Sequence, residues 1–268
     1  MAFFECNKAT ICKKNEFAGK LSVMTRELRS SNCTNVEWLG RVDCARCHVR
    51  KLMLFSELPE TAFDKLLQPI DHFRFPRGVT LYETGGDDRV IYSIRQGLVK
   101  LMHYADDGTR RIVRLLGPGA SVGLELLDGV DGYRHTAVTV NEVDACRIPL
   151  ATVNELQSRY PALCNQVRQH LQDHLDRADK WILALGAGPA RERVAHLLLM
   201  LGEFSTDPNG DIGLLGREDM AAIVGTSVET VSRIIAEFKR GRLLYKVAED
   251  LYRIDKPALQ AIAHAAAG

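Results

Sequence analysis

The segment GTSVETVSRIIAEFKRG, residues 225–241, is predicted to be a helix whose two faces differ in chemistry. Residues three or four apart share a face, because an α-helix advances about 100° per residue. An apolar stripe is formed by Val228, Val231, Ile234, Ile235 and Phe238. The opposite face carries Glu229, Ser232, Arg233 and Arg240, whose side chains donate and accept hydrogen bonds. Such a face either lies in solvent or contacts the base edges and phosphates of DNA.

The sequence on both sides of this helix favours DNA binding. REDMAAIVG is predicted to be a short amphipathic helix that ends at Gly225, a residue suited to a left-handed C-cap. Thr226 or Ser227 can cap the helix that follows, and the pair then forms a helix-turn-helix. GRLLYKVAEDLYRI is predicted to be a β-hairpin, which completes a winged helix. Residues 228–246 carry five Lys or Arg against two Glu, a local positive charge suited to phosphate contacts.

An ordinary helical hairpin with a solvated polar face is the alternative on spacing alone. Glu229 would then complete a capping box with Thr226 as the N-cap, which keeps its carboxylate away from any base. The predicted hairpin and the local positive charge favour the winged helix over this alternative.

Length and composition indicate about two domains with cores of their own. The chain has 268 residues and a net charge of +1. No apolar run approaches the roughly 20 residues that cross a bilayer, and no signal peptide is recognised at the N-terminus. We therefore expect a cytoplasmic protein without a membrane partner. No Ser-His-Asp, Walker or Rossmann pattern stands out, so we do not expect an enzyme.

The cysteines are unevenly distributed. Five of the seven lie in the first 50 residues, and Cys44 and Cys47 form a C-x-x-C pair in DCARC. In a reducing compartment, clustered cysteines favour metal binding or redox chemistry over structural disulfides. A redox or electron-transfer protein that uses them catalytically is the alternative from another functional class.

The chain is predicted to have four segments and an α+β fold. Residues 1–50 are rich in cysteine and have little periodicity. Residues 51–160 are predicted to form a sensor domain that begins with a helix at 50–67. Short β-prone runs then alternate with turn signals such as TGGDD and GPG, a pattern typical of an antiparallel β-barrel or jelly roll. A long helix is predicted over 161–186, and the winged helix-turn-helix domain over 187–268.

The long helix carries a heptad pattern when Cys164 is placed at an a position. The predicted a/d seam consists of Val167, Leu171, His174, Ala178, Trp181 and Leu185. A seam of this length indicates a coiled-coil contact in a homodimer. A helix packed on its own domain is the alternative.

A β-barrel, a long helix and a winged helix-turn-helix, in that order, resemble the CRP/FNR family of bacterial transcription regulators. The resemblance covers roughly residues 44–262 and is strongest in GTSVETVSRIIAEF, YSIRQGLVKL and DACRIPLATVNEL. It implies a cyclic-nucleotide-binding-like sensor domain, a homodimer, palindromic double-stranded DNA and RNA polymerase as partners.

The recognition-helix pattern E-x-x-S-R, carried by Glu229, Ser232 and Arg233, resembles the FNR branch and implies a TTGAT half-site. An arginine can donate two hydrogen bonds to guanine, and a glutamate can accept one from cytosine. Thr226, Ser227 and Arg240 are expected to be further DNA contacts.

The same resemblance implies a [4Fe–4S] cluster that responds to oxygen, redox state or nitric oxide. Cys44, Cys47 and Cys146 match three of the four ligand positions. Met53 stands at the remaining N-terminal position, and a thioether substitutes poorly for a thiolate on iron. Cys33 is the predicted fourth ligand. Further candidates are Cys12, Cys6 and His48.

Other sensing chemistries stay open. The cysteines can act as thiols without a cluster, with Cys146 as a small buried residue, or the barrel can hold haem or a small effector. Cyclic AMP is not expected, because the family's Arg-Ser pair is absent and Arg134 is followed by His135. FNR proteins place a carboxylate in the dimer seam where this chain has Ala178, which implies a dimer in both signal states.

Overall fold

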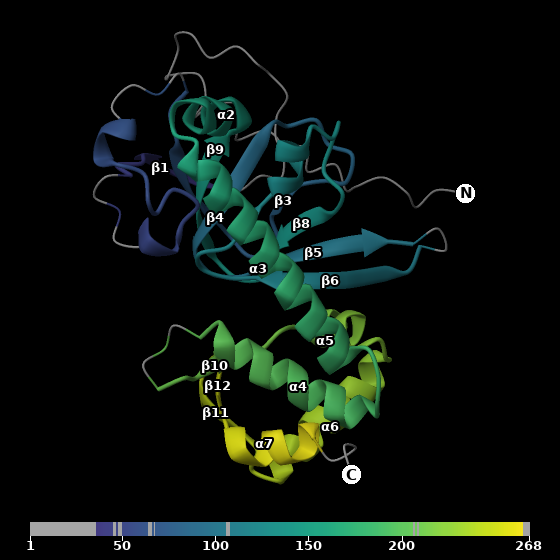
Figure 1. Cartoon of the computed structure of the whole chain (residues 1–268). Coiled ribbons are helices and arrows are strands. Elements are labelled where there is room, and N and C mark those ends of the chain that lie inside the picture. The colour runs from purple at the N-terminus through teal and green to yellow at the C-terminus, as the bar shows by residue number, and fades with distance from the viewer. Residues whose placement is uncertain are drawn as a thin grey trace. The chain divides into compact units, whose positions relative to one another are not determined.

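The computed structural model describes residues 36–264 except 45–46, 48–49, 64–65, 67, 106–107, 206 and 208. Cys6, Cys12, Cys33 and His48 therefore lie outside the described residues. The chain divides into two compact units, which Figure 1 shows with their elements labelled. The first comprises Met1–Leu101 and Leu116–Val167, and the second comprises Met102–Leu115 and Arg168–Gly268.

Two antiparallel sheets build the sensor fold. The five-stranded sheet has the order β1 (Glu37–Arg41), β2 (Asp71–Phe75), β9 (Val143–Pro149), β4 (Val90–Gln96), β7 (Ser121–Val122). The four-stranded sheet has the order β3 (Thr80–Tyr82), β8 (Thr136–Thr139), β5 (Val99–Tyr104), β6 (Arg110–Leu116). The predicted fold class is confirmed, with sheets that are jelly-roll-like and have free edges instead of closing into a barrel.

Aromatic packing fills the interior of the sensor fold. The ring of Tyr82 stacks on that of Tyr133 with 3.7 Å between centroids, and Phe75 meets Tyr92 edge to face at 5.9 Å. All four side chains are buried. Burying a large apolar side chain contributes about 1.5–3 kcal/mol, so these rings fix the sheets that carry the functional side chains.

Two predictions for the N-terminal part are wrong. The helix expected over 50–67 is replaced by the 3-10 helices η1 (Arg50–Leu52) and η2 (Glu60–Phe63). Pro59 separates them, because proline lacks an N–H and moves the preceding residue out of the α region. In addition, β1 lies in the segment expected to be irregular, where Trp38 Nε1 donates to Asp71 Oδ1 of β2 at 3.2 Å.

Three helical segments follow the β-strands of the sensor fold or join them. The short 3-10 helix η3 (Leu124–Asp128) connects β7 and β8, and α2 (Leu150–Arg159) follows β9 directly. The long helix α3 (Ala162–Leu185) lies within the range predicted for the dimer helix. None of the described helices is both long and apolar enough to span a membrane.

The burial pattern of α3 differs from the predicted seam. Of the six seam residues, Val167, His174 and Leu185 are buried within the chain, whereas the other three are half-buried. The exposed apolar side chains of α3 are Leu175 (60% exposed), Ile182 (64%) and Leu183 (82%). His174 is buried against its own chain, near the guanidinium groups of Arg114 and Arg177.

The winged helix is built as predicted. Its helices are α4 (Ala190–Glu203), α5 (Arg217–Val224), α6 (Val228–Arg240) and α7 (Lys256–Ala263). A three-stranded sheet has the order β10 (Ile212–Gly213), β12 (Leu251–Ile254), β11 (Leu244–Ala248). Gly225 separates α5 from α6 with a φ of 69°, the left-handed conformation that glycine adopts readily.

The apolar stripe of α6 packs into the core of this domain. Val231, Ile234, Ile235 and Phe238 are buried, whereas Val228, at the first turn, is 37% exposed. The stripe therefore fixes the rotation of the helix and leaves its polar face outside.

Candidate DNA-binding face and thiol pocket

The N-terminus of α6 is fixed by Ser227. The Ser227 hydroxyl accepts a hydrogen bond from the Thr230 backbone N–H at 3.2 Å and donates to the Thr230 hydroxyl at 3.1 Å. Ser227 is therefore the N-cap, one of the two residues predicted for that position, and Thr226 is not. Such a cap contributes about 1 kcal/mol and fixes the start of the helix.

Glu229 lies exposed in the first turn of α6. Hydrogen bonds from its own backbone N–H and from Ser227 lower the pKa of its carboxyl group. The carboxylate is therefore anionic at neutral pH, where it can accept a hydrogen bond. The capping-box alternative with Thr226 as the N-cap is wrong, because Ser227 is the N-cap and Glu229 lies only two positions beyond it. The Glu229 carboxylate is accessible.

The remaining polar face of α6 has no hydrogen-bond or ion-pair partner in the described part of the chain. Ser232, Arg233 and Arg240 are exposed, and none of them forms a hydrogen bond or ion pair with another described residue. By contrast, Glu237 is half-buried and pairs with Arg191 at 2.8 Å. The face therefore presents a carboxylate, a hydroxyl and two guanidinium groups that can contact a binding partner.

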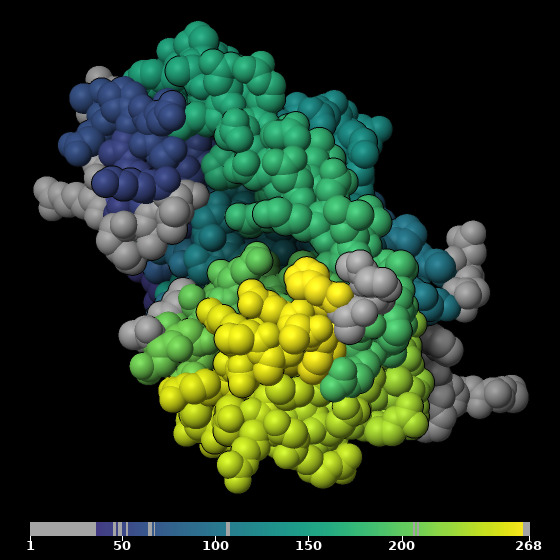
Figure 2. Space-filling view, turned by 60° about the horizontal axis from the view of Figure 1, so that its bottom comes forward, coloured from purple at the N-terminus to yellow at the C-terminus, as the bar shows by residue number. Residues whose placement is uncertain are grey.

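The wing adds basic side chains to which the sequence alone assigned no individual role. Arg242 and Lys246 are exposed and have no polar partner among the described residues, whereas Lys239 lies over the Tyr252 ring at 4.6 Å. Figure 2 shows the yellow-green and yellow residues of α6, the wing and α7 as one continuous surface. Arg242 and Lys246 extend the positive charge of α6 onto the wing.

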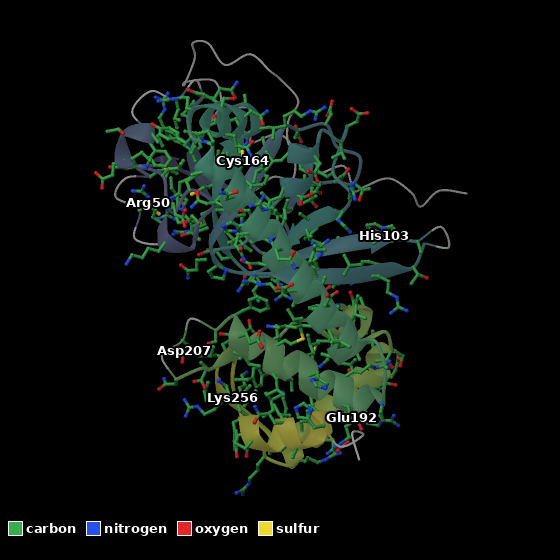
Figure 3. All side chains as sticks on the ribbon, viewed as in Figure 1. Arg50, His103, Cys164, Glu192, Asp207 and Lys256 are labelled. Carbon is green, nitrogen blue, oxygen red and sulfur yellow. The ribbon has the colours of Figure 1, made fainter. Side chains whose placement is uncertain are left out.

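Three of the predicted thiols meet in one pocket of the first unit. Cys146 lies on β9, and Cys44 and Cys47 come from the loop after β1. They line a small cavity of about 30 Å³ together with Arg50, which Figure 3 labels. The other lining residues are Val42, Met53, Phe55, Phe63, Ile70, Ser93 and Ile148. Thiols that are far apart in the sequence are thus brought together by the loop after β1 and the centre of the sheet.

Arg95, which lies in the YSIRQGLVKL run but had no role assigned from the sequence, contacts two of these sulfurs. Its Nη1 lies 3.3 Å from Cys47 Sγ and 3.9 Å from Cys146 Sγ. In β4, Ile94 pairs with Ala145 and Gln96 with Asp144, so Arg95 is the extra residue of a β-bulge. A bulge redirects the side chain of its extra residue, and this one reaches the thiols.

Burial and mutual proximity oppose ionisation of the thiols. Burial, with added repulsion from Cys146 and Cys47, raises the pKa of the Cys44 thiol to about 12. Burial also raises the pKa of Cys146, although the hydrogen bond from Arg95 opposes that change. In this conformation the pocket therefore favours protonated thiols at Cys44 and Cys146.

The donor set of the pocket consists of three thiols and one thioether. Among the described residues, no three His, Cys, Asp or Glu side chains are close enough together to hold one metal ion. Cluster ligands bind separate irons, so they lie farther apart than the ligands of one ion. Met53 is 7% exposed in the pocket wall and supplies only a thioether. The described residues therefore supply three thiols to this pocket.

Tyr133 and Arg134 follow the 3-10 helix η3 in the sensor fold. Tyr133 is buried between Tyr82 and Gly123, where an added Cβ on the glycine would lie 3.0 Å from the Tyr133 ring. The Tyr133 hydroxyl donates to the Val90 carbonyl at 2.7 Å. Arg134 is exposed and its backbone N–H donates to Glu125. The expectation that cyclic AMP is not the ligand stays a prediction.

Comparisons with known proteins match both the sensor fold and the winged helix. The model of the cyclic nucleotide-binding domain matches residues 72–160, and that of the Crp-like helix-turn-helix domain matches residues 192–262. The chain is 27% identical over 227 residues to the transcriptional regulatory protein btr of Bordetella pertussis, covering 81% of this chain and 91% of that protein. It is 26% identical to the fumarate and nitrate reduction regulatory protein of Vibrio cholerae, covering 76% and 83%.

Solved structures agree with the fold. FixK2 from Bradyrhizobium japonicum superposes with a TM-score of 0.64 at 20% identity, covering 72% of this chain and 96% of that chain. A CRP-family transcriptional regulator from Thermus thermophilus superposes with a TM-score of 0.61 at 26% identity, covering 71% and 95%.

Proposed function

Because the chain belongs to the CRP/FNR family of DNA-binding transcription regulators, we propose that it binds an FNR-type TTGAT palindrome as a homodimer. The observation that carries this proposal is the exposed polar face of α6, whose rotation is fixed by a buried apolar stripe and a capped N-terminus. A DNA-binding role places its action in the cytoplasm, with RNA polymerase as a further partner.

Each group on the face has a role in the proposed complex. Arg233 donates two hydrogen bonds to a guanine, and Glu229 accepts one from a cytosine amino group. Ser232 contacts a neighbouring base, and Arg240 contacts a phosphate together with the wing residues Arg242 and Lys246. Thr226 and Ser227, at the helix N-terminus, lie where a phosphate is favoured by the helix dipole.

The dimer contact uses α3, with a seam adjusted to the observed burial. We keep Leu171 and Ala178 and place Leu175 and Ile182 in the seam instead of His174 and Trp181. The four positions follow the 4-3-4 spacing of a coiled coil, and two of them are exposed apolar side chains in the chain as described. Leu175→Asp is expected to give monomers in analytical ultracentrifugation, whereas dimers in this variant would refute the adjusted seam.

The thiol pocket is the proposed signal input, as a [4Fe–4S] site on Cys44, Cys47, Cys146 and Cys33. The cluster would supply reactivity toward oxygen or nitric oxide. In this proposal the positions of Cys44 and Cys47 change when the site is loaded. That movement is the change that the rest of the chain can detect.

A short route connects this loop to α3 within the first unit. The backbone of Arg50 donates to the Cys47 carbonyl at 3.0 Å, and the turns that follow lead through Met53 to Ser56. The Gln166 side chain on α3 donates to the Ser56 hydroxyl at 2.9 Å, while its Oε1 is buried without a hydrogen-bond partner among the described residues. Gln166 is therefore held by the sensor loop and responds when that loop moves. Allosteric control requires that the sensing site and the DNA-binding site both shift the equilibrium of one shared element, and α3 is that element in this proposal.

Iron and sulfide analysis of anaerobically purified protein tests the cluster. Cys47→Ser, Cys146→Ser and Cys33→Ser are each expected to remove iron, because each deletes one thiolate ligand. Cys164→Ser is the matched control, since Cys164 is exposed on α3 and lies outside the pocket. Full iron in any of the first three variants would exclude that residue as a ligand.

Thiol chemistry without a cluster is the second candidate, and the contact of one Arg95 nitrogen with two sulfurs favours it. Wild-type protein that lacks iron and sulfide, yet changes its DNA affinity on reversible oxidation, would support this candidate. A sharp haem absorption band would refute both.

A further inference from the structure

The guanidinium group of Arg95 differs from that of Arg50, the other arginine at the thiol pocket, in what it contacts. Arg50 donates to the Leu58 carbonyl and lies 5.5 Å from the Phe63 ring. Arg95 donates to the sulfurs of Cys47 and Cys146. Arg95 is therefore the cation whose partners are the candidate ligands themselves.

The carboxylate of Asp144, which also acts on Arg95, is engaged by the guanidinium group of Arg74. Asp144 accepts two hydrogen bonds from Arg74, at 2.9 and 3.3 Å, and lies 3.9 Å from His72. The Arg95 guanidinium is half-buried, and its Nη1 lies within hydrogen-bond distance of two sulfurs. Sulfurs that bind a metal group are thiolates, and a guanidinium in this position donates charge-assisted hydrogen bonds to them.

We propose that Arg95 is the positioning residue and counter-charge of the thiol site, donating hydrogen bonds to the ligating sulfurs of Cys47 and Cys146. This inference rests on the proposed thiol site. The β-bulge in β4 places the Arg95 side chain at the thiol site, because a regular strand would have no extra residue beside Cys146. Hydrogen bonds to ligand sulfurs and the local net charge set both the affinity and the reduction potential of such sites.

Arg95→Gln tests the proposal in the full-length protein, with Arg95→Lys as the charge-retaining variant. Arg89→Gln is the matched control, because Arg89 is exposed immediately before β4 and donates to the Val130 carbonyl instead. The anaerobic, iron-loaded proteins are mixed with an iron chelator, and the rate of iron loss and the reduction potential are measured.

Arg95→Gln is expected to lose iron about tenfold faster than wild type, as the loss of one hydrogen bond to a charged group predicts. Its potential is expected to fall, since removing a positive charge disfavours the more negative reduced state. Arg95→Lys should recover part of both effects, and Arg89→Gln should match wild type. An unchanged rate and potential in Arg95→Gln would overturn the proposal.

A second probe keeps the test independent of the cluster. Reduced, iron-free proteins are titrated with Cd²⁺, for which the two sulfurs that Arg95 contacts suffice as ligands, and the ultraviolet absorption of cadmium–thiolate bonds is followed. Arg95→Gln is expected to bind Cd²⁺ about tenfold more weakly than wild type. If wild type takes up no iron, the cluster proposal fails and the Cd²⁺ titration alone decides. Equal Cd²⁺ affinities would then overturn the role of Arg95.

Discussion

Replacing Arg233 with alanine is expected to weaken recognition of the DNA sequence without changing the stability of the fold. The side chain is exposed and has no hydrogen bond or ion pair with another described residue. Its removal therefore leaves no buried group without a partner, and the free energy of unfolding should change by no more than about 0.5 kcal/mol. The core of α6, anchored by the buried Phe238, is untouched.

The expected effect is on discrimination between DNA sequences. A bidentate arginine–guanine contact contributes about 1–3 kcal/mol of discrimination, which is roughly 5- to 150-fold in affinity. A dimer makes this contact in each half-site, and well-separated positions add approximately, so binding to the whole palindrome weakens by about 2–6 kcal/mol. Binding to unrelated DNA should change little, because it depends on phosphate contacts.

Fluorescence anisotropy with labelled duplexes measures this effect. The palindrome, a scrambled duplex and a palindrome altered at the guanine are compared for wild type and Arg233→Ala at fixed salt. Arg240→Ala is the matched control: it should weaken binding to all duplexes equally and reduce the salt slope by about 0.9 for each phosphate that is no longer neutralised. Undiminished preference for the palindrome in Arg233→Ala would refute the assignment of Arg233 to base reading.

Three other perturbations address the cap, a buried histidine and the proposed signal route. Ser227→Ala should lower the unfolding free energy by about 1 kcal/mol in denaturant titrations, with Thr226→Ala nearly unchanged. Burial, with the guanidinium groups of Arg114 and Arg177, lowers the pKa of His174 to about 4. His174 is thus neutral when folded, so its contribution to stability is present above about pH 6.5 and declines as the pH falls toward 4. His174→Leu should reduce this dependence of the unfolding free energy on pH. An unchanged pH dependence in the variant would refute the role of His174. Gln166→Leu should make DNA affinity independent of the thiol site, while iron binding persists.

The repeating features of the fold were predictable because they follow periodicity. The stripe from Val231 to Phe238, the glycine turn at Gly225 and the cap at Ser227 depend on neighbours within a few positions of the sequence. The same holds for the alternation of strands and turns in the sensor fold. Local spacing also placed Cys44 and Cys47 together.

Features that depend on tertiary contacts were not predictable. The bulge at Arg95 arises from the register between β4 and β9, which no local pattern encodes. The strand β1 forms because an edge of β2 is available, although its own five residues show no alternation. Whether His174 is buried depends on which side of α3 packs against its own chain. A heptad pattern identifies the apolar positions of the helix but not the surface that each position contacts.

The DNA affinity of anaerobic and air-exposed wild-type protein tests most directly whether the chain is a signal-dependent reader of this palindrome. Anisotropy with the TTGAT palindrome and a scrambled duplex is measured in both states at one salt concentration. We predict a strong preference for the palindrome in one state and a much weaker one in the other. No preference for the palindrome in either state would contradict the proposed function.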